Sequence, residues 1–287
     1  MPLNGYQKMC YRWFGRVAEN VANEKIKFDL ERAHINMRAG AYVSYVWMNT
    51  IITAIVTTFV SMTLFVFLSL PIFSVIIFII IPVFTTIITY YILLNYPASK
   101  AKARGKKIDM HLPYALNFIS AMSSAGITPT EIFKSLSKQR IYGEIREEAL
   151  WIYRDVGLLG RDIISAIKAN IKRTPSEKFK EFLQGAIVTV QSGGALKPYF
   201  MTKAEQYARE NRISQKQMIE SLGIMAETYV TAAVAGILLI IIIIPLLMII
   251  SKRPVSELES MYLFVLIVIP LIHIGFSVVL SSMCEKV

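Results

Sequence analysis

Histidine and cysteine are the residue types best suited to catalysis and metal binding, and this chain has few of them, far apart in the sequence. The three histidines are His34, His111 and His273, and the two cysteines are Cys10 and Cys284. The sequence has neither the H-E-x-x-H or C-x-x-C spacing of metal sites nor the G-x-S-x-G turn that presents a nucleophilic serine. It therefore predicts no catalytic residue, no cofactor-binding residue, no metal site and no enzymatic activity.

A basic run over residues 100–107 contains the sequence R-G-K-K, which is reminiscent of a phosphate-binding loop. It lacks the G-x-x-x-x-G-K-[ST] spacing that such loops need, so no nucleotide site follows. The run comes directly after a long apolar stretch. We therefore expect it to set membrane topology and to attract anionic lipid headgroups.

A second set of charged residues lies in the polar stretch from Leu112 to Phe200. Its members are candidates for a partner interface: Arg140, Arg146, Arg154, Asp155, Arg161, Asp162, Lys168, Lys172 and Arg173. Two interpretations stay open, a basic surface that binds an acidic partner or scattered side chains that are only solvated. For Asp162 we expect the cap of a helix, with interface contact as the alternative.

The distribution of charge predicts a membrane protein. Residues 39–99 contain no Asp, Glu, Lys or Arg, and two further charge-free runs cover residues 228–251 and 260–284. Because roughly 20 apolar residues cross a bilayer as a helix, these runs accommodate four spans. We place the spans near residues 51–70, 72–95, 230–250 and 261–282.

Orientation follows from lysine and arginine, which accumulate on the cytoplasmic side of membrane proteins. Seven lie in residues 1–47 and 21 in residues 96–228. This predicts a multi-pass protein of the cell membrane with both termini in the cytoplasm, where cysteines stay reduced. The same bias accounts for most of the net charge of +11, so nucleic acid is not an expected partner.

The predicted organisation has six parts. They are cytoplasmic amphipathic N-terminal helices (1–48), a transmembrane hairpin of two spans (49–96), a cytoplasmic helical domain (97–228), transmembrane helix 3 (229–251), a short extracellular loop (252–260), and transmembrane helix 4 with a cytoplasmic tail (261–287).

The N-terminal segment predicts a helix over residues 6–24 with one apolar stripe. The stripe consists of Tyr6, Met9, Trp13, Val17 and Val21, at spacings of three and four. It can pack onto the cytoplasmic domain or lie in the lipid headgroup layer. A second short helix is expected over residues 29–38, leading to an aromatic belt at Tyr42, Tyr45 and Trp47.

The predicted spans contain one titratable residue, His273, which we expect to be hydrogen-bonded to a neighbouring helix, with a proton relay as the alternative. Ion-coupled transport needs ionisable groups inside the bilayer. Their scarcity disfavours a small transporter or channel component with a helical regulatory domain, which is the rival interpretation. Pro82, Pro245 and Pro270 are expected to kink their spans.

Helical periodicity predicts an all-α, six-helix bundle for the cytoplasmic domain. Its helices are expected over residues 108–125, 130–139, 144–156, 162–171, 175–192 and from Lys197 onward. The last has no stop signal before the third span, so we predict one continuous helix into the membrane. Glycines expected to form structural turns are Gly126, Gly157, Gly160, Gly193 and Gly194.

Several short motifs in this order resemble the type II secretion F domain. They are Leu112-Pro113, S-A-G at residues 124–126, L-L-G-R-D at 158–162, T-P-S at 174–176, and Q-S-G-G at 191–194. The F domain is the cytoplasmic module of the platform proteins of type IV pili, type II secretion systems and archaeal flagella. Many members hold two F domains, whereas this chain is similar to the short form with one.

The resemblance implies a non-enzymatic membrane platform that docks a hexameric secretion ATPase and passes pilin-like subunits from the bilayer into a filament. With one F domain, the platform is expected to be completed by self-association or by a paralogous F-type subunit.

Overall fold

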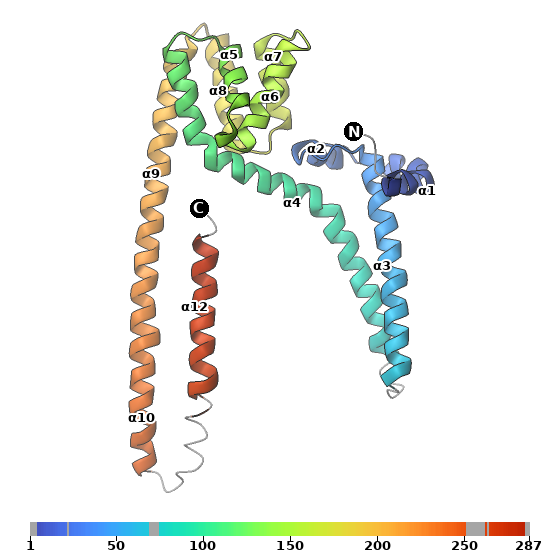
Figure 1. The fold of residues 1–287 in the computed structure, drawn as a ribbon, viewed down its shortest axis with the longest axis vertical. Helices are drawn as coiled ribbons and strands as arrows, with labels where there is room; N and C mark the ends of the chain where they lie inside the picture. The colour runs from blue at the N-terminus through green and yellow to red at the C-terminus, as the bar shows by residue number, and fades with distance from the viewer. Residues whose placement is uncertain (1–4, 22, 69–74, 251–261, 263, 285–287) are drawn as a thin grey trace. The chain divides into compact units, whose positions relative to one another are not determined.

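The computed structural model describes residues 5–21, 23–68, 75–250, 262 and 264–284. The chain divides into one unit of residues 1–205 and another of residues 206–287, each described by itself. Every element in the described ranges is helical (Figure 1), which confirms the all-α class. The predicted turn of the hairpin and the loop at residues 252–260 lie outside the described residues.

The chain begins with α1 (Gly5–Val21) and α2 (Glu24–Arg32). The expected helix over residues 29–38 is wrong, because α2 ends six residues earlier. His34 takes the left-handed conformation with φ 53°, and its N–H donates to the carbonyl of Glu31 while that of Ile35 donates to Leu30. These two bonds form a Schellman motif, in which the residue after the helix end turns the chain away.

The hairpin consists of α3 (Ala39–Leu68) and the first part of α4 (Val75–Ser124). We expected a separate helix from Ile108, and this is wrong: α4 continues for 50 residues through three internal prolines and bends along its length (Figure 1). Residues 39–64 and 80–124 are long and apolar enough to cross a membrane by length and composition.

One hydroxyl of α3 compensates for a proline of α4. Pro97 has no N–H, so it leaves the carbonyl of Leu93, four residues earlier, without its helical partner. The Tyr42 hydroxyl donates to this carbonyl oxygen at 2.6 Å. Tyr42 is itself buried and packs beside Val46, so the bond fixes α3 against α4.

The same arrangement recurs deeper in the hairpin. Pro82 removes the donor for the carbonyl of Phe78, and the Ser61 hydroxyl donates to that oxygen at 2.6 Å. Ser61 is 7% exposed. A kinked helix thus keeps its carbonyls paired at both positions, as an apolar environment requires.

Five helices follow α4, and three of them, α5, α6 and α8, pack against α4 (Figure 1). They are α5 (Pro129–Lys138), α6 (Glu144–Gly157), α7 (Ile163–Arg173), α8 (Glu177–Gln191) and α9 (Leu196–Tyr229), with a short 3₁₀ turn, η2 (Arg140–Tyr142), before α6. Helical periodicity also predicts two apolar faces in this domain, and most of their residues are buried in the core: Leu112, Ala115, Leu116, Ile119, Phe179, Phe182, Leu183, Ala186 and Ile187. The remaining two, Met122 and Val190, are partly buried. These predicted faces are therefore confirmed.

Side chains cap the starts of α7 and α8, and the cap at Asp162 was predicted. Asp162 is the N-cap of α7 and accepts from the N–H groups of Ile164 and Ser165 at 3.0 and 3.4 Å. Ser176 caps α8 by accepting from the Phe179 N–H at 2.9 Å, and its own hydroxyl donates to the Asp109 carboxylate on α4. One side chain thus closes α8 and attaches it to α4.

Two of the predicted glycine turns are Schellman motifs. Gly126 after α4 and Gly193 after α8 have φ of 80° and 73°, and Gly160 also has a positive φ of 62°. By contrast, Gly157 lies in the last turn of α6, and Gly194 has no positive φ. Left-handed backbone therefore explains three of the five glycines.

The second unit holds the rest of α9, a π-helical turn η3 (Val230–Ala235), α10 (Gly236–Ile250), a second π-helical turn η4 (Phe264–Val268) and α12 (Ile269–Cys284). The backbone stays helical from Leu196 to Ile250, in agreement with the predicted continuous helix. His273 bonds to the carbonyl of Ile269 in its own helix at 2.8 Å, whereas we expected a bond to a neighbouring helix. The Tyr229 ring of α9 lies edge-on to the imidazole.

Candidate functional site

Arg104 is the residue for which the expected role was wrong. It belongs to the basic run at residues 100–107, which we assigned to lipid headgroups, yet it is 6% exposed. Its neighbours Lys102 and Lys106 are exposed. On this part of α4, the lysines therefore face solvent and the Arg104 side chain points into the protein.

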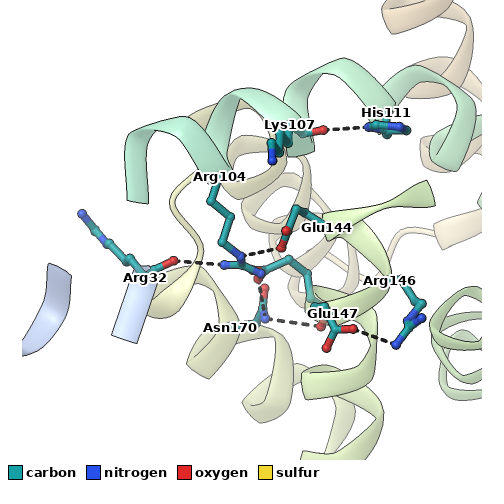
Figure 2. Close-up of polar contacts among 9 residues, drawn as sticks. Arg32, Arg104, Lys107, His111, Glu144, Arg146, Glu147 and Asn170 are labelled. Carbon is teal, nitrogen blue, oxygen red and sulfur yellow. Dashed lines mark hydrogen bonds and ion pairs between the residues drawn. The ribbon is translucent and has the colours of Figure 1, made fainter. Parts of the chain in front are cut away.

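The Arg104 guanidinium connects three helices (Figure 2). Its Nε lies 2.8 Å from Glu144 Oε2, and its Nη2 lies 2.6 Å from Glu148 Oε1, both on α6. Its Nη1 donates to the backbone carbonyl of Arg32 at 3.2 Å, at the last residue of α2. The carboxylates are spaced four residues apart, so they share one helix face and reach the same guanidinium.

Glu148 is the most deeply buried acid of this network. It is 1% exposed, and its Oε2 accepts from Asn170 Nδ2 on α7 at 3.0 Å. Burial raises the pKa of the Glu148 carboxyl, while Arg104 and then Asn170 oppose that shift. The network, defined as Arg32, Arg104, Glu144, Glu148 and Asn170, thus joins α2 and α4 to the helical domain.

A ring stack lies next to the network. His34, directly after α2, stacks on Trp151 of α6 with ring centroids 4.4 Å apart and 14° between planes. The Arg173 guanidinium lies 4.6 Å from the same indole and pairs with Asp155 at 2.6 Å. Burial, and next the charge of Arg104, lower the pKa of His34 to about 4.

Because His34 titrates, we expect its stacking contact with Trp151 to be sensitive to acid. His34 is neutral when folded, with a pKa of about 4, against roughly 6.5 in an unfolded chain. Its contribution to stability is therefore present above pH about 6.5 and is lost as pH falls toward about 4. Arg104, Lys100 and Arg173 disfavour the imidazolium, and Glu144 favours it.

We expect Trp151 fluorescence to report loss of the stack on acidification through this interval, and His34→Asn to remove that pH dependence. Asparagine tolerates the left-handed backbone but does not titrate. Equal acid responses of the parent and the variant would contradict the prediction.

The predicted interface residues fall into separate groups. Arg154, Arg161 and Asp162 surround the exposed turn between α6 and α7, and Lys168 and Lys172 line a groove between α7 and α2. Asp155 is 5% exposed and pairs with Arg161 and Arg173, while Arg146 pairs with Glu147. Arg140 is exposed in η2.

Sequence reasoning missed two features of the helical domain. Leu158 and Leu159 in the α6–α7 turn are 75% and 60% exposed, and they form an apolar centre between Arg154 and Arg161. Their position beside Gly160 was a usable signal, because consecutive leucines in a turn have no helical face on which to be buried.

Gly105 is the second missed feature. A Cβ atom at this position would lie 2.8 Å from the carbonyl oxygen of Pro175. The glycine lets α4 approach the backbone between α7 and α8, which brings the adjacent Arg104 into reach of α6. The R-G-K-K sequence is thus a packing motif.

Part of the chain is similar to a known protein family. Residues 115–244 match the family model described as type II secretion system (T2SS), protein F. This match agrees with the resemblance to the F domain found in the sequence. With two apolar helices of membrane-spanning length, the chain is a membrane protein.

Three relatives come from Methanocaldococcus jannaschii. The uncharacterized protein MJ1286 is 35% identical over 52% of this chain and 25% of its own length. Flagella accessory protein J is 24% identical over 78% of this chain and 38% of its own length. The uncharacterized protein MJ0780 is 29% identical over 46% of this chain and 40% of its own length.

This chain thus spans between a quarter and two fifths of the length of these relatives. No solved structure matches it.

Proposed function

We propose that this protein is an integral membrane platform of a type IV pilus, archaeal flagellum or type II secretion-like machine. The observation that carries the proposal is an F domain whose first helix, α4, is continuous with an apolar span. The similarity to Flagella accessory protein J supports it. In this role the protein is a scaffold without enzymatic activity.

The proposed topology has four spans, both termini and the six-helix F domain in the cytoplasm, and short loops outside. The excess of lysine and arginine in residues 1–47 and 96–228 supports this orientation. A second copy or a paralogous F-type subunit would supply the further F domain that many platforms have.

The proposed cytoplasmic partner is a hexameric secretion ATPase. The α6–α7 turn is the strongest candidate contact, because Leu158 and Leu159 form an exposed apolar pair flanked by the basic residues Arg154 and Arg161. Such a combination fits an acidic groove with an apolar floor. Pilin-like subunits are the proposed partners of the membrane helices.

The proposal is tested by deleting the coding sequence and counting surface filaments by electron microscopy. We expect filaments to be lost and to return when the parent chain is supplied from a plasmid. Intact filaments in the deletion strain would overturn the proposal. Solute flux through liposomes that contain only this protein would instead support the rival transporter or channel function.

A further inference from the structure

Helix α1 has two separate apolar surfaces, and the protein covers one of them. Cys10, Gly15 and Ala18 are buried, and Phe14 meets Trp47 of α3 in an edge-to-face contact with centroids 6.1 Å apart. This surface packs α1 across the beginning of α3.

The other surface is the predicted apolar stripe, and its residues are exposed to different degrees. Met9 is 47% exposed, Trp13 73%, and Val17 and Val21 57% each, with Tyr6 at 38%. Of the two alternatives for this stripe, packing onto the cytoplasmic domain therefore does not agree with the structure. A row of large apolar side chains that the protein leaves exposed on one helix indicates contact with a membrane or with another protein.

The position of α1 on α3 shows which end of the stripe lies nearer to the apolar span. Tyr6, on the stripe side, donates to Asn49 Oδ1 at 3.4 Å and meets the Tyr45 ring at 6.0 Å. Glu19, on another side of α1, lies against Gly40, where an added Cβ would be 2.7 Å from Glu19 Cγ. Asn49 is nine residues closer than Gly40 to the apolar core of the span. The N-terminal end of the stripe thus lies nearer to the apolar core of the span than the C-terminal end of α1 does.

The charges of α1 complete the pattern of an interfacial helix. Lys8, Arg12 and Arg16 recur every four residues and are all exposed, so they form a basic row beside the stripe. The carboxylate of Glu19 is engaged by the Tyr11 hydroxyl at 2.6 Å. Basic residues above an apolar face are suited to anionic headgroups above acyl chains.

We propose that α1 lies in the headgroup layer of the bilayer at the base of α3, with its exposed stripe among the upper acyl chains and its basic row on anionic lipid headgroups. The helix then fixes the depth and tilt of α3 by contact with lipid. This inference rests on α1 and α3 alone and is independent of the proposed platform function.

Depth-dependent quenching of Trp13 tests the proposal. The full chain with Trp47→Phe and Trp151→Phe, which leaves Trp13 as its single tryptophan, is reconstituted into vesicles of phosphatidylcholine and phosphatidylglycerol. Because interfacial helices insert roughly 5–10 Å, lipids brominated high on the acyl chain should quench Trp13 more than lipids brominated near the chain end. Aqueous iodide should quench it weakly.

The matched control moves the tryptophan to the basic row. A chain with Lys8→Trp and Trp13→Phe in the same background should respond in the opposite way, strongly to iodide and weakly to brominated lipid. Two results would overturn the proposal: a Trp13 open to iodide and insensitive to bromine, or a Trp13 shielded from both quenchers, which would indicate a protein partner such as a second copy.

A second measurement avoids the phenylalanine substitutions. The unmodified sequence is labelled with 5-fluorotryptophan, and the Trp13 resonance is assigned by its loss in Trp13→Phe. A gadolinium chelate carried on a lipid headgroup should broaden this resonance more than that of Trp151. Equal broadening of both resonances would contradict the proposal.

Discussion

Arg104→Met should destabilise the cytoplasmic helices by about 3–5 kcal/mol, the usual cost of removing one partner of a buried ion pair. The substitution removes the ion-pair partner of Glu148, which is 1% exposed, and leaves its carboxylate with the Asn170 amide at 3.0 Å. It also removes the donor to the Arg32 carbonyl that holds the end of α2. Urea unfolding in detergent micelles, followed by tryptophan emission, measures the loss.

The matched control for this prediction is Lys102→Met. Lys102 lies on the same helix in the same basic run but is exposed, so its loss should change the free energy of unfolding by no more than about 0.5 kcal/mol. Arg104→Met with Glu148→Gln should recover part of the loss, because glutamine carries no charge and can still accept from Asn170. Equal stabilities of Arg104→Met and Lys102→Met would show that Arg104 has only the lipid-facing role.

Tyr42→Phe should destabilise the α3–α4 hairpin by about 1–3 kcal/mol, because it leaves the part-buried Leu93 carbonyl without a donor. The substitution keeps the aromatic ring, and therefore most of the packing around Val46. Thermal unfolding in detergent micelles, monitored by circular dichroism, measures the effect.

The reason for this loss can be tested separately, since the Leu93 carbonyl lacks a backbone donor because residue 97 is proline. Pro97→Ala restores the backbone N–H, so Tyr42→Phe should cost much less in a Pro97→Ala background. If Tyr42→Phe costs the same in both backgrounds, the hydroxyl does not replace the missing donor. Ser61→Ala with Pro82→Ala provides a parallel cycle deeper in the hairpin.

The local features of the helical domain could be predicted because they depend on neighbouring residues. The N-cap role of Asp162 and the left-handed positions of Gly126 and Gly193 follow from residue type and position at a helix end. The apolar faces of the helices near Leu116 and Phe182 follow from helical periodicity. These interactions join residues one or two helical turns apart, so sequence patterns can predict them.

The features that could not be predicted depend on contacts distant in sequence. Arg104 lies in a run of basic residues, and only its contact with α6, 40 residues later, distinguishes it from the exposed lysines around it. The continuity of α4 through Pro97 was missed for a similar reason, because its compensating donor, Tyr42, is 51 residues away. The early end of α2 requires a left-handed histidine, which propensity disfavours.

The candidate interface was identified as a set of charges, and the structure changes how its members are interpreted. Asp155 and Arg173 pair with each other at 2.6 Å, so they hold α6 to α7 in the free protein. Arg154, Leu158, Leu159 and Arg161 surround an exposed turn. This smaller group is the part of the prediction that we carry forward as a docking surface.

The most direct test of the proposed platform function is the affinity of this chain, reconstituted in nanodiscs, for the hexameric secretion ATPase of the same cell. We expect saturable binding that weakens at least tenfold, or about 1.4 kcal/mol, with Leu158→Asp and Leu159→Asp combined. Val188→Asp is the matched control, because Val188 is a 60% exposed apolar residue on α8, and it should bind like the parent. Absence of saturable binding by the parent chain would contradict the account.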